Sequence, residues 1–112
     1  MQSMKRINEP PLEVIIQMKE LGLRVRSARK RRNWRAIDLA DRAGLSRTAI
    51  DAVEAGNPTT GIATYLRALW ALGLNRELDL LADPGLDRDG LALEISAQSK
   101  RVSVARKINN DF

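Results

Sequence analysis

The residues with the clearest chemical potential are basic, and many of them lie in one short segment. Between Lys19 and Arg35 the chain has eight basic residues and a single acidic one, although the whole chain carries a formal charge of only +5. Such a cluster attracts polyanions, but a solvated helix face has the same composition. The charge alone therefore indicates nucleic-acid binding without establishing it.

Enzymatic chemistry has few candidate residues, because the sequence contains no histidine and no cysteine. This composition excludes disulfides, Cys/His zinc sites, thiol nucleophiles and relays of the Ser-His-Asp type. No remaining side chain titrates near neutrality without a large pKa shift. We therefore expect a protein that is not an enzyme and that binds neither a metal nor a cofactor.

The basic segment overlaps the first helix that the apolar pattern predicts, which runs from about Leu12 to Arg32. Its stripe recurs at alternating spacings of four and three residues: Val14, Met18, Leu21, Val25 and Ala28. Pro11 suits the first turn because it has no amide hydrogen to satisfy. Gly22 lies inside this helix, where we expect a bend.

Shorter helices follow, each delimited by capping or turn residues. The first spans Ala36–Arg42 and ends at Gly44, and the second is capped by Ser46 and runs through Ala55. A further apolar stripe consists of Ile62, Leu66, Leu69 and Leu72, with Tyr65 beside it, and it stops at Gly73. A fifth short helix is capped by Asn75 and ends at Leu81.

The second and third predicted helices have the spacing of a helix-turn-helix unit. Ala40 is small where two helices must cross closely, and Gly44 can take the positive φ that a tight turn needs. The apolar positions that would fix the pair against the first helix are Leu39, Leu45, Ile50 and Val53. An ordinary helical hairpin is the alternative, but the fixed offsets and the neighbouring basic segment favour a DNA-binding unit.

The stretch from Leu21 to about Leu81 resembles the lambda-repressor-like, or Cro/cI-type (XRE), helix-turn-helix family. The resemblance implies an all-α, five-helix domain of bacterial or phage origin that binds palindromic operators as a dimer. The features most similar to HipB-type antitoxins are the Gly-Asn-Pro-Thr-Thr loop, the segment Tyr65–Leu74 and the extra region after the fifth predicted helix. Those proteins repress their own operon and bind a HipA-type kinase toxin.

One departure from the family concerns the start of the second helix. The family often has Thr-Gln where this chain has Arg35 and Ala36, and that glutamine commonly helps to bind a DNA phosphate. Arg35 is our candidate for supplying the contact instead.

The third predicted helix would enter the major groove with its amino end first. The side chains expected to lie nearest the base edges are Ser46, Arg47, Thr48 and Asp51. The planar fork of Arg47 can bind O6 and N7 of guanine together, and Thr48 can offer a hydroxyl or touch a thymine methyl. Asp51 can accept from a cytosine amine or orient Arg47. For Ser46 a purely structural role as helix cap is an equal alternative, and Asp51 can equally serve only in an intrahelical pair.

Phosphate contacts are expected from residues that flank this helix in the sequence. Arg35 and Asn57 are the first candidates, and Arg32 and Arg42 are the second; simple solvation is the alternative for each. Arg29 and Glu54 border the expected core from two different helices, so we expect them to form an ion pair. The family resemblance implies the same partly buried bridge.

The sequence therefore predicts three parts: an N-terminal arm over 1–11, a helix-turn-helix DNA-binding domain over 12–82, and a C-terminal extension over 83–112 for dimer or partner contacts. Apolar and polar residues alternate at Leu91, Leu93 and Ile95 and again at Val102 and Val104, which is compatible with short β-strands. No apolar run approaches the ~20 residues of a membrane span. The start of the chain lacks the apolar stretch of a signal peptide, so a cytoplasmic protein is expected.

The extension offers two kinds of contact. The dimer surface that we predict consists of Leu78, Leu81, Leu86, Leu91, Leu93 and Ile95, unless these residues close the monomer's own core. The segment after Ile95 has three possible fates: a disordered DNA-binding arm, an edge strand built on Val102 and Val104, or a segment that orders on a HipA-like toxin with Phe112 as anchor.

Two other function classes remain open at this point. An RNA-binding module would stack bases on exposed aromatic residues, but we expect Trp34, Trp70 and Tyr65 to pack in the core. A helical adaptor that keeps the fold without binding DNA is the second alternative, alongside a stand-alone repressor with no toxin partner. Duplex binding that falls steeply with salt would separate DNA binding from the adaptor.

Overall fold

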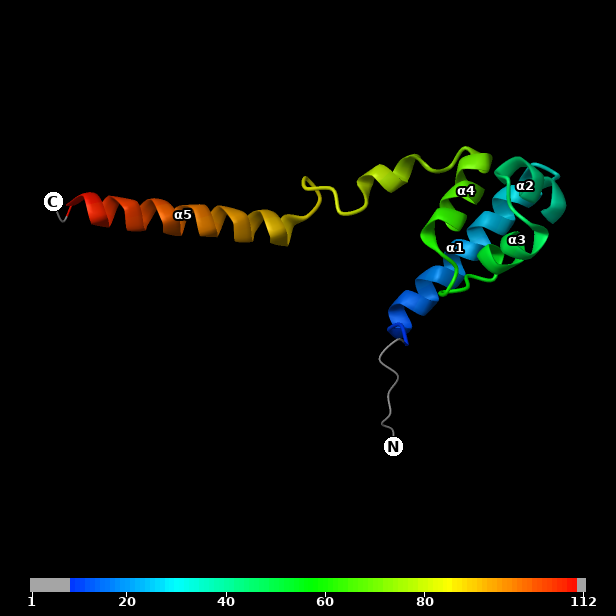
Figure 1. The fold of residues 1–112 in the computed structure, drawn as a ribbon, viewed down its shortest axis with the longest axis horizontal. Helices are drawn as coiled ribbons and strands as arrows, with labels where there is room; N and C mark the ends of the chain where they lie inside the picture. Colours follow the sequence, from blue (N-terminus) through cyan, green and yellow to red (C-terminus); the bar gives the residue numbers. More distant parts are fainter. Residues whose placement is uncertain (1–8, 111–112) are drawn as a thin grey trace, which may run out of the picture. The chain divides into compact units, whose positions relative to one another are not determined.

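The computed structural model describes residues 9–110, and the regular secondary structure of this range is helical, with no β-strand (Figure 1). The elements are α1 (Leu12–Arg31), α2 (Ala36–Ala43), α3 (Arg47–Glu54), α4 (Ile62–Leu72), the 3₁₀ helix η1 (Arg76–Leu80) and α5 (Arg88–Asn110). The chain divides into two compact units, the first ending at Arg76 and the second beginning at Glu77. The expected all-α class is confirmed, and the described residues contain five α-helices.

The first unit encloses a single core between α1, α2, α3 and α4. The apolar positions of the helix-turn-helix pattern lie in it, since Leu39, Ile50 and Val53 are fully buried and Leu45 is packed against them. The rest of the core consists of Val25, Ala28, Ala36, Ala40, Tyr65, Ala68 and Leu72. Burial of these side chains supplies the main force that holds α3 in place.

The backbone of α1 approaches the end of α3 closely at two glycines. A Cβ on Gly22 would lie 2.5 Å from the carbonyl oxygen of Glu54, and one on Gly56 would lie 2.6 Å from Cα of Lys19. Gly56 also has a φ of 68°. α1 continues as one helix through Gly22, where the absence of a side chain allows the two backbones to approach; the expected bend stays a prediction.

The buried face of α4 is rotated relative to the stripe that the sequence indicated. Tyr65, Ala68 and Leu72 are buried, whereas Ile62 at the start of the expected stripe is exposed. Trp70 is also exposed, so its expected place in the core is wrong, while Trp34 is half-buried. The reason is geometric, because a face centred on Ala68 brings the helix close to its neighbours and turns Trp70 outward.

The expectation of short strands in the C-terminal extension is also wrong. Residues 88–110 form α5, which contains every apolar residue that suggested alternation. In a helix, Leu91, Ile95 and Val102 lie on one side and Leu93 and Val104 on the other, so a period of two over so few residues also fits two helix faces. The edge strand expected in the C-terminal segment is therefore wrong as well. Phe112, the expected anchor, lies outside the described residues.

The segment between α4 and α5 is short and consists of turns and one 3₁₀ helix. The expected fifth helix from Asn75 to Leu81 is the 3₁₀ helix η1, and the fifth α-helix is α5 instead. The leucines expected at a dimer surface are exposed, apart from half-buried Leu78, so they do not close a core of their own unit. None of the described helices combines the length and apolar character needed to cross a membrane.

Candidate nucleic-acid interface

α3 is a short helix whose buried side is fixed and whose opposite side is free. The Ser46 hydroxyl accepts a hydrogen bond of 3.0 Å from the backbone N–H of Ala49, so this residue is the N-cap. Ile50 and Val53 bury one face completely. The exposed side chains that remain near the amino end are Arg47, Thr48 and Asp51. All four residues expected near base edges are therefore exposed at or near the amino end of α3.

Arg47 and Asp51 lie one turn apart and form a loose ion pair. Nε of Arg47 is 3.7 Å from Oδ1 of Asp51, and the two side chains are 63 % and 60 % exposed. An exposed pair of this kind is worth about 0.3–0.5 kcal/mol, because water screens it and both side chains lose freedom. The guanidinium is oriented along the helix surface but remains available to a ligand.

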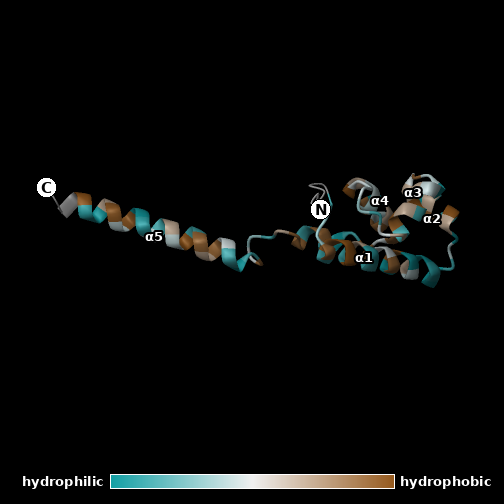
Figure 2. Cartoon of the chain, turned by 90° about the horizontal axis from the view of Figure 1, so that it is seen from below, coloured by the Kyte–Doolittle hydropathy of each residue, from teal (hydrophilic) through white to brown (hydrophobic). Residues whose placement is uncertain are grey.

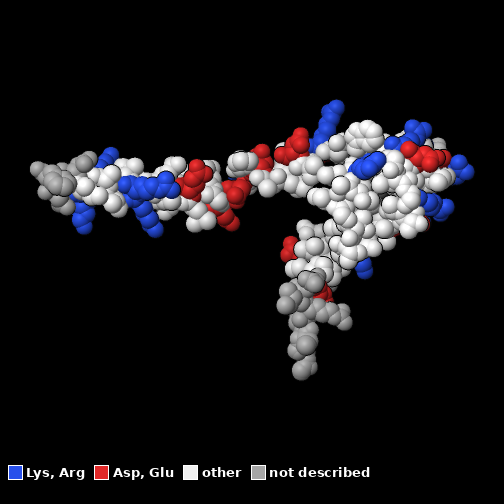
Figure 3. Space-filling model, in the orientation of Figure 1, with Lys and Arg blue, Asp and Glu red and all other residues white. Residues whose placement is uncertain are grey.

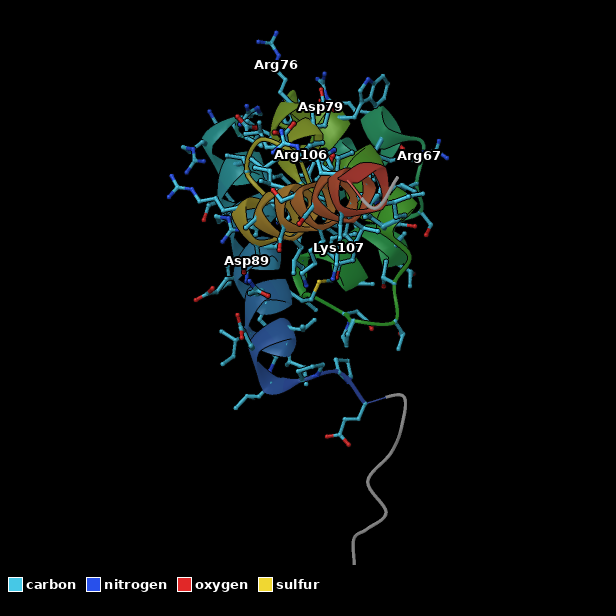
Figure 4. All side chains as sticks on the ribbon, turned by 90° about the vertical axis from the view of Figure 1, so that its left-hand side faces the viewer. Arg67, Arg76, Asp79, Asp89, Arg106 and Lys107 are labelled. Atoms are coloured by element: carbon cyan, nitrogen blue, oxygen red, sulfur yellow. The ribbon has the colours of Figure 1, made fainter. Side chains whose placement is uncertain are left out.

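The turn between α2 and α3 depends on Gly44 and on a residue of α4. Gly44 has a φ of 69°, and the N–H of Leu45 donates to the carbonyl of Ala40 over 2.9 Å. Nε of Arg67 donates to the carbonyl of Ala43 over 3.0 Å and so caps the end of α2 (Figure 4). The sequence analysis did not identify Arg67 as a capping residue. Its position as a lone basic residue in the apolar helix α4 could have indicated such a role.

Arg29 and Glu54 connect α1 to the end of α3. Nε and Nη2 of Arg29 donate to the two carboxylate oxygens of Glu54 over 2.6 and 2.9 Å, and Nη1 donates to the carbonyl of Trp34 over 2.9 Å. The side chains are only 11 % and 10 % exposed. The hydrogen bonds that Arg29 donates to Glu54 raise the pKa of Arg29, and desolvation by burial opposes this rise. This bidentate bridge fixes the carboxyl end of α3, while Ser46 fixes its amino end.

Arg35 stands at the start of α2, on the surface. Its guanidinium donates to the carboxylate of Asp38 over 3.1 and 3.2 Å, and its backbone N–H donates to the same carboxylate over 2.7 Å. These hydrogen bonds lower the pKa of Asp38, and the same pair raises the pKa of Arg35. The Arg35 side chain is nevertheless 80 % exposed. It can therefore reach an anion without leaving a buried site.

The other expected phosphate ligands have different surroundings. Arg32 donates to the carbonyls of Ala28 and Leu72 over 2.8 and 3.0 Å, which joins the ends of α1 and α4. The Arg42 guanidinium lies 4.1 Å from the centroid of the Trp34 ring. Arg32 is thus used within the fold, whereas Arg42 is exposed.

Asn57 begins the loop after α3 and holds that loop together. Its side-chain oxygen accepts from the backbone N–H and the hydroxyl of Thr59, and its carbonyl accepts from the Tyr65 hydroxyl over 2.7 Å. Burial raises the pKa of Tyr65. The loop that follows the exposed helix is therefore anchored to α4.

The basic segment does not form a single face of α1. At 100° per residue, Lys19, Arg26 and Lys30 lie on one flank of the helix, and Arg24 and Arg31 lie on the other. All five are exposed, whereas Arg29 is buried and Arg32 is half-buried. Blue Lys and Arg side chains are accordingly spread over the space-filling surface of the first unit in Figure 3.

A family model described as a helix-turn-helix domain matches residues 20–81 of the chain. The match includes α2, α3, the Gly44 turn and all ten residues named above as base, phosphate or ion-pair candidates. Neither curated proteins nor solved structures give a match. Within the described residues, no cluster of acidic side chains could hold a metal ion.

Proposed function

Because this chain belongs to the helix-turn-helix domain family, we propose that it is a transcriptional repressor that binds a specific sequence of double-stranded DNA. The observation that carries the proposal is the exposed amino end of α3, where Arg47, Thr48 and Asp51 share one surface above the buried Ile50 and Val53. In a helix-turn-helix domain the rest of the domain holds such a helix in position to enter the major groove. The Ser46 cap and the Arg29–Glu54 bridge hold it at both ends.

In this proposal the three exposed side chains divide the base contacts. Arg47 donates to O6 and N7 of a guanine, and Asp51 orients the guanidinium or accepts from a neighbouring cytosine amine. Thr48 contributes a hydroxyl or a methyl contact. Ser46 keeps its role as N-cap, since its oxygen accepts from Ala49, and its hydroxyl proton and second lone pair remain available to a base edge.

In this proposal, contacts to the DNA phosphates come from residues at the two ends of the helix-turn-helix unit. Arg35, exposed at the amino end of α2, and Asn57, after α3, are the phosphate ligands that we favour, and Arg42 is a third. The N-terminal end of a helix favours an anion, which adds to the case for Arg35. Arg32 ranks last because both of its terminal nitrogens already bind carbonyl oxygens.

We further propose that the protein acts as a homodimer on a palindromic operator. A helix of eight residues reads too few base pairs for specificity, and a second copy one helical turn away supplies the rest. The exposed leucines of the second unit are the available apolar surface.

The finer biological assignment rests on the resemblance to HipB-type antitoxins. We propose that the repressor is the autoregulating antitoxin of a HipBA-like operon and binds a HipA-like kinase toxin. Co-expression with the adjacent gene of the operon tests this assignment. Co-purification of a kinase-like neighbour with the full-length chain supports it, and its absence leaves a stand-alone repressor. A chain stopped after Ser99 that still retains the neighbour would show that the last residues are not required.

The DNA proposal is tested by selecting duplexes from a random pool with the full-length protein. If a dimer neutralises ~6 to 10 phosphates, affinity for the selected duplex falls by about 10³ to 10⁵ between 50 and 200 mM salt. Arg47→Ala should cost roughly 1–3 kcal/mol on the selected duplex and little on a scrambled one. Arg76→Ala, which removes an exposed arginine at the end of the first unit, is the control (Figure 4).

Each alternative predicts a different result in this experiment. Equal losses on both duplexes would assign Arg47 to the phosphate backbone. The absence of any salt-dependent duplex binding would favour the helical adaptor, and preference for single-stranded RNA would favour the RNA module. For the RNA alternative, Trp70 is the exposed aromatic ring among the described residues on which a base could stack.

A further inference from the structure

α5 is a helix of 23 residues with apolar side chains along its whole length (Figure 2). Leu91, Ile95 and Val102 are 48 %, 54 % and 51 % exposed. Most helical stability in proteins comes from packing an apolar face against another element. The exposure of this face therefore indicates that α5 is made to pack against a partner.

One face of α5 has the residue spacing of a two-stranded coiled-coil interface, called the seam below. Positions 91, 95, 98, 102 and 105 follow one another at intervals of four, three, four and three residues. They hold Leu91, Ile95, Gln98, Val102 and Ala105. The opposite face carries Leu93, Ala97 and Val104, but Lys100 stands between them, and a lysine inside a seam would be buried without a partner.

The charges of α5 are polarised along its axis. Asp87, just before the helix, Asp89 and Glu94 lie toward its start, with Arg88 between them; Lys100, Arg101, Arg106 and Lys107 lie toward its end. Red atoms therefore cluster near the beginning of α5 and blue atoms farther along it in Figure 3, and Figure 4 labels Asp89, Arg106 and Lys107. A helix with this distribution is complementary to a second copy of itself running in the opposite direction.

We infer that α5 pairs with α5 of a second copy of this chain, antiparallel, through the face that contains Leu91, Ile95 and Val102. The inference deepens the proposed dimer and rests on it, because it names the helix and the direction that form it. It does not depend on DNA.

The seam positions fix the register of the pair. When Leu91 lies opposite the partner's Val102, Ile95 lies opposite the partner's Gln98, and the two-fold axis passes between this Ile95–Gln98 layer and its symmetry-related copy. Glu94 then flanks the seam beside the partner's Arg101, and symmetry repeats this pair. A parallel arrangement would instead bring Arg101 beside the partner's Arg106 twice. Like charges in that position oppose pairing, so the sequence selects the antiparallel direction.

The first experiment measures the oligomeric state of the full chain without DNA, by sedimentation equilibrium over a range of concentrations. Val102→Asp should raise the dimer Kd at least ~10-fold, because the seam would bury two unpaired carboxylates. Val104→Asp is the matched control: the same residue type, two positions away, 58 % exposed and on the opposite face. It should leave the Kd unchanged. A monomer at all concentrations, or equal losses in both variants, would overturn the inference.

The second experiment determines the direction. Arg101→Glu should weaken an antiparallel dimer, and the double variant with Glu94→Arg should restore it; a parallel dimer would be strengthened by Arg101→Glu. Because the chain has no cysteine, single cysteines give an independent readout. Leu91→Cys should cross-link with Val102→Cys protein and not with itself, since two antiparallel Leu91 positions lie about 16 Å apart along the axis at about 1.5 Å per residue. Self-cross-linking of Leu91→Cys would overturn the direction.

Helix content measured by circular dichroism shows whether a variant has lost the dimer or the fold. DNA binding is measured separately, so a dimer that binds no DNA would refute the proposed function while leaving this inference intact. A protein that binds DNA but stays monomeric would refute this inference while leaving the proposed DNA binding intact.

Discussion

The first unit and α5 use their polar and apolar residues in opposite ways. In the first unit, apolar side chains from four helices meet in one core, and a buried arginine is fully bonded to a carboxylate and a carbonyl. In α5, apolar residues of similar size are about half exposed, and oppositely charged residues are separated along the axis. The surface of α3 is thus positioned by contacts within the chain, whereas the apolar face of α5 remains exposed and available to the second copy proposed above.

The largest effect should come from the Arg29–Glu54 bridge. Glu54→Ala leaves the Arg29 guanidinium buried without its carboxylate, which should lower the free energy of unfolding by about 3–5 kcal/mol. Urea unfolding of the two single variants and the double variant gives the coupling energy of the pair. The exposed Arg47–Asp51 pair is the control, with a coupling of under ~0.5 kcal/mol. Equal coupling in the two pairs would contradict the contrast between buried and exposed bridges.

The next effect concerns two glycines that share a backbone conformation but not their surroundings. Gly56 has a φ of 68° and Gly73 a φ of 74°, yet only Gly56 lies against the backbone of α1. Gly73→Ala should cost about 1–2 kcal/mol from the left-handed conformation alone. Gly56→Ala should cost a further ~1–3 kcal/mol because α1 must move.

Thermal or urea unfolding of both variants measures the difference. A Gly56→Ala variant no less stable than Gly73→Ala would show that the approach of α1 to the end of α3 is not tight. That result would also weaken the case that α1 fixes the position of the exposed helix.

A third test compares one valine in each region. Val53 is fully buried in the first unit, whereas Val104 lies exposed on the face of α5 opposite the proposed seam. Val53→Ala should cost about 2 kcal/mol, from lost burial and the cavity that remains. Val104→Ala should stay within about 0.5 kcal/mol. A cost at Val104 equal to that at Val53 would mean that this second face of α5 is also covered in solution.

Much of the first unit could be predicted from its sequence because its signals are local and repeated. The Ser46 cap, the Gly44 turn and the spacing of Leu39, Ile50 and Val53 each act over a few residues and agree with one another. Arg29 and Glu54 could be paired because both border apolar stripes of known helices. The order of the first four helices follows from the same signals.

Other features depend on contacts that are distant in the sequence. Arg32 caps α4 by donating a hydrogen bond to the carbonyl of Leu72, 40 positions away. The residues that neighbour Arg32 in the sequence do not predict this contact. The exposure of Trp70 depends on a small rotation of α4, which hydrophobic type alone does not fix. The sequence of α5 suggested strands because a short run of alternating apolar residues fits a strand and two opposite helix faces equally well. These choices are made by tertiary packing.

The smallest effect is a titration of Tyr65, the only tyrosine of the chain. Its ring is buried, and its hydroxyl donates to the carbonyl of Asn57 over 2.7 Å. Burial disfavours the charged phenolate and so raises the pKa of Tyr65 above its usual value of about 10. The stabilisation from the neutral ring is therefore fully present below the unfolded pKa and is lost as the pH rises through the folded one. The ultraviolet absorbance of tyrosinate should give a midpoint above that of the same chain in denaturant, with Tyr65→Phe as the blank. Coincident midpoints would mean that the ring is open to water, and that the loop after α3 is not anchored as the structure describes.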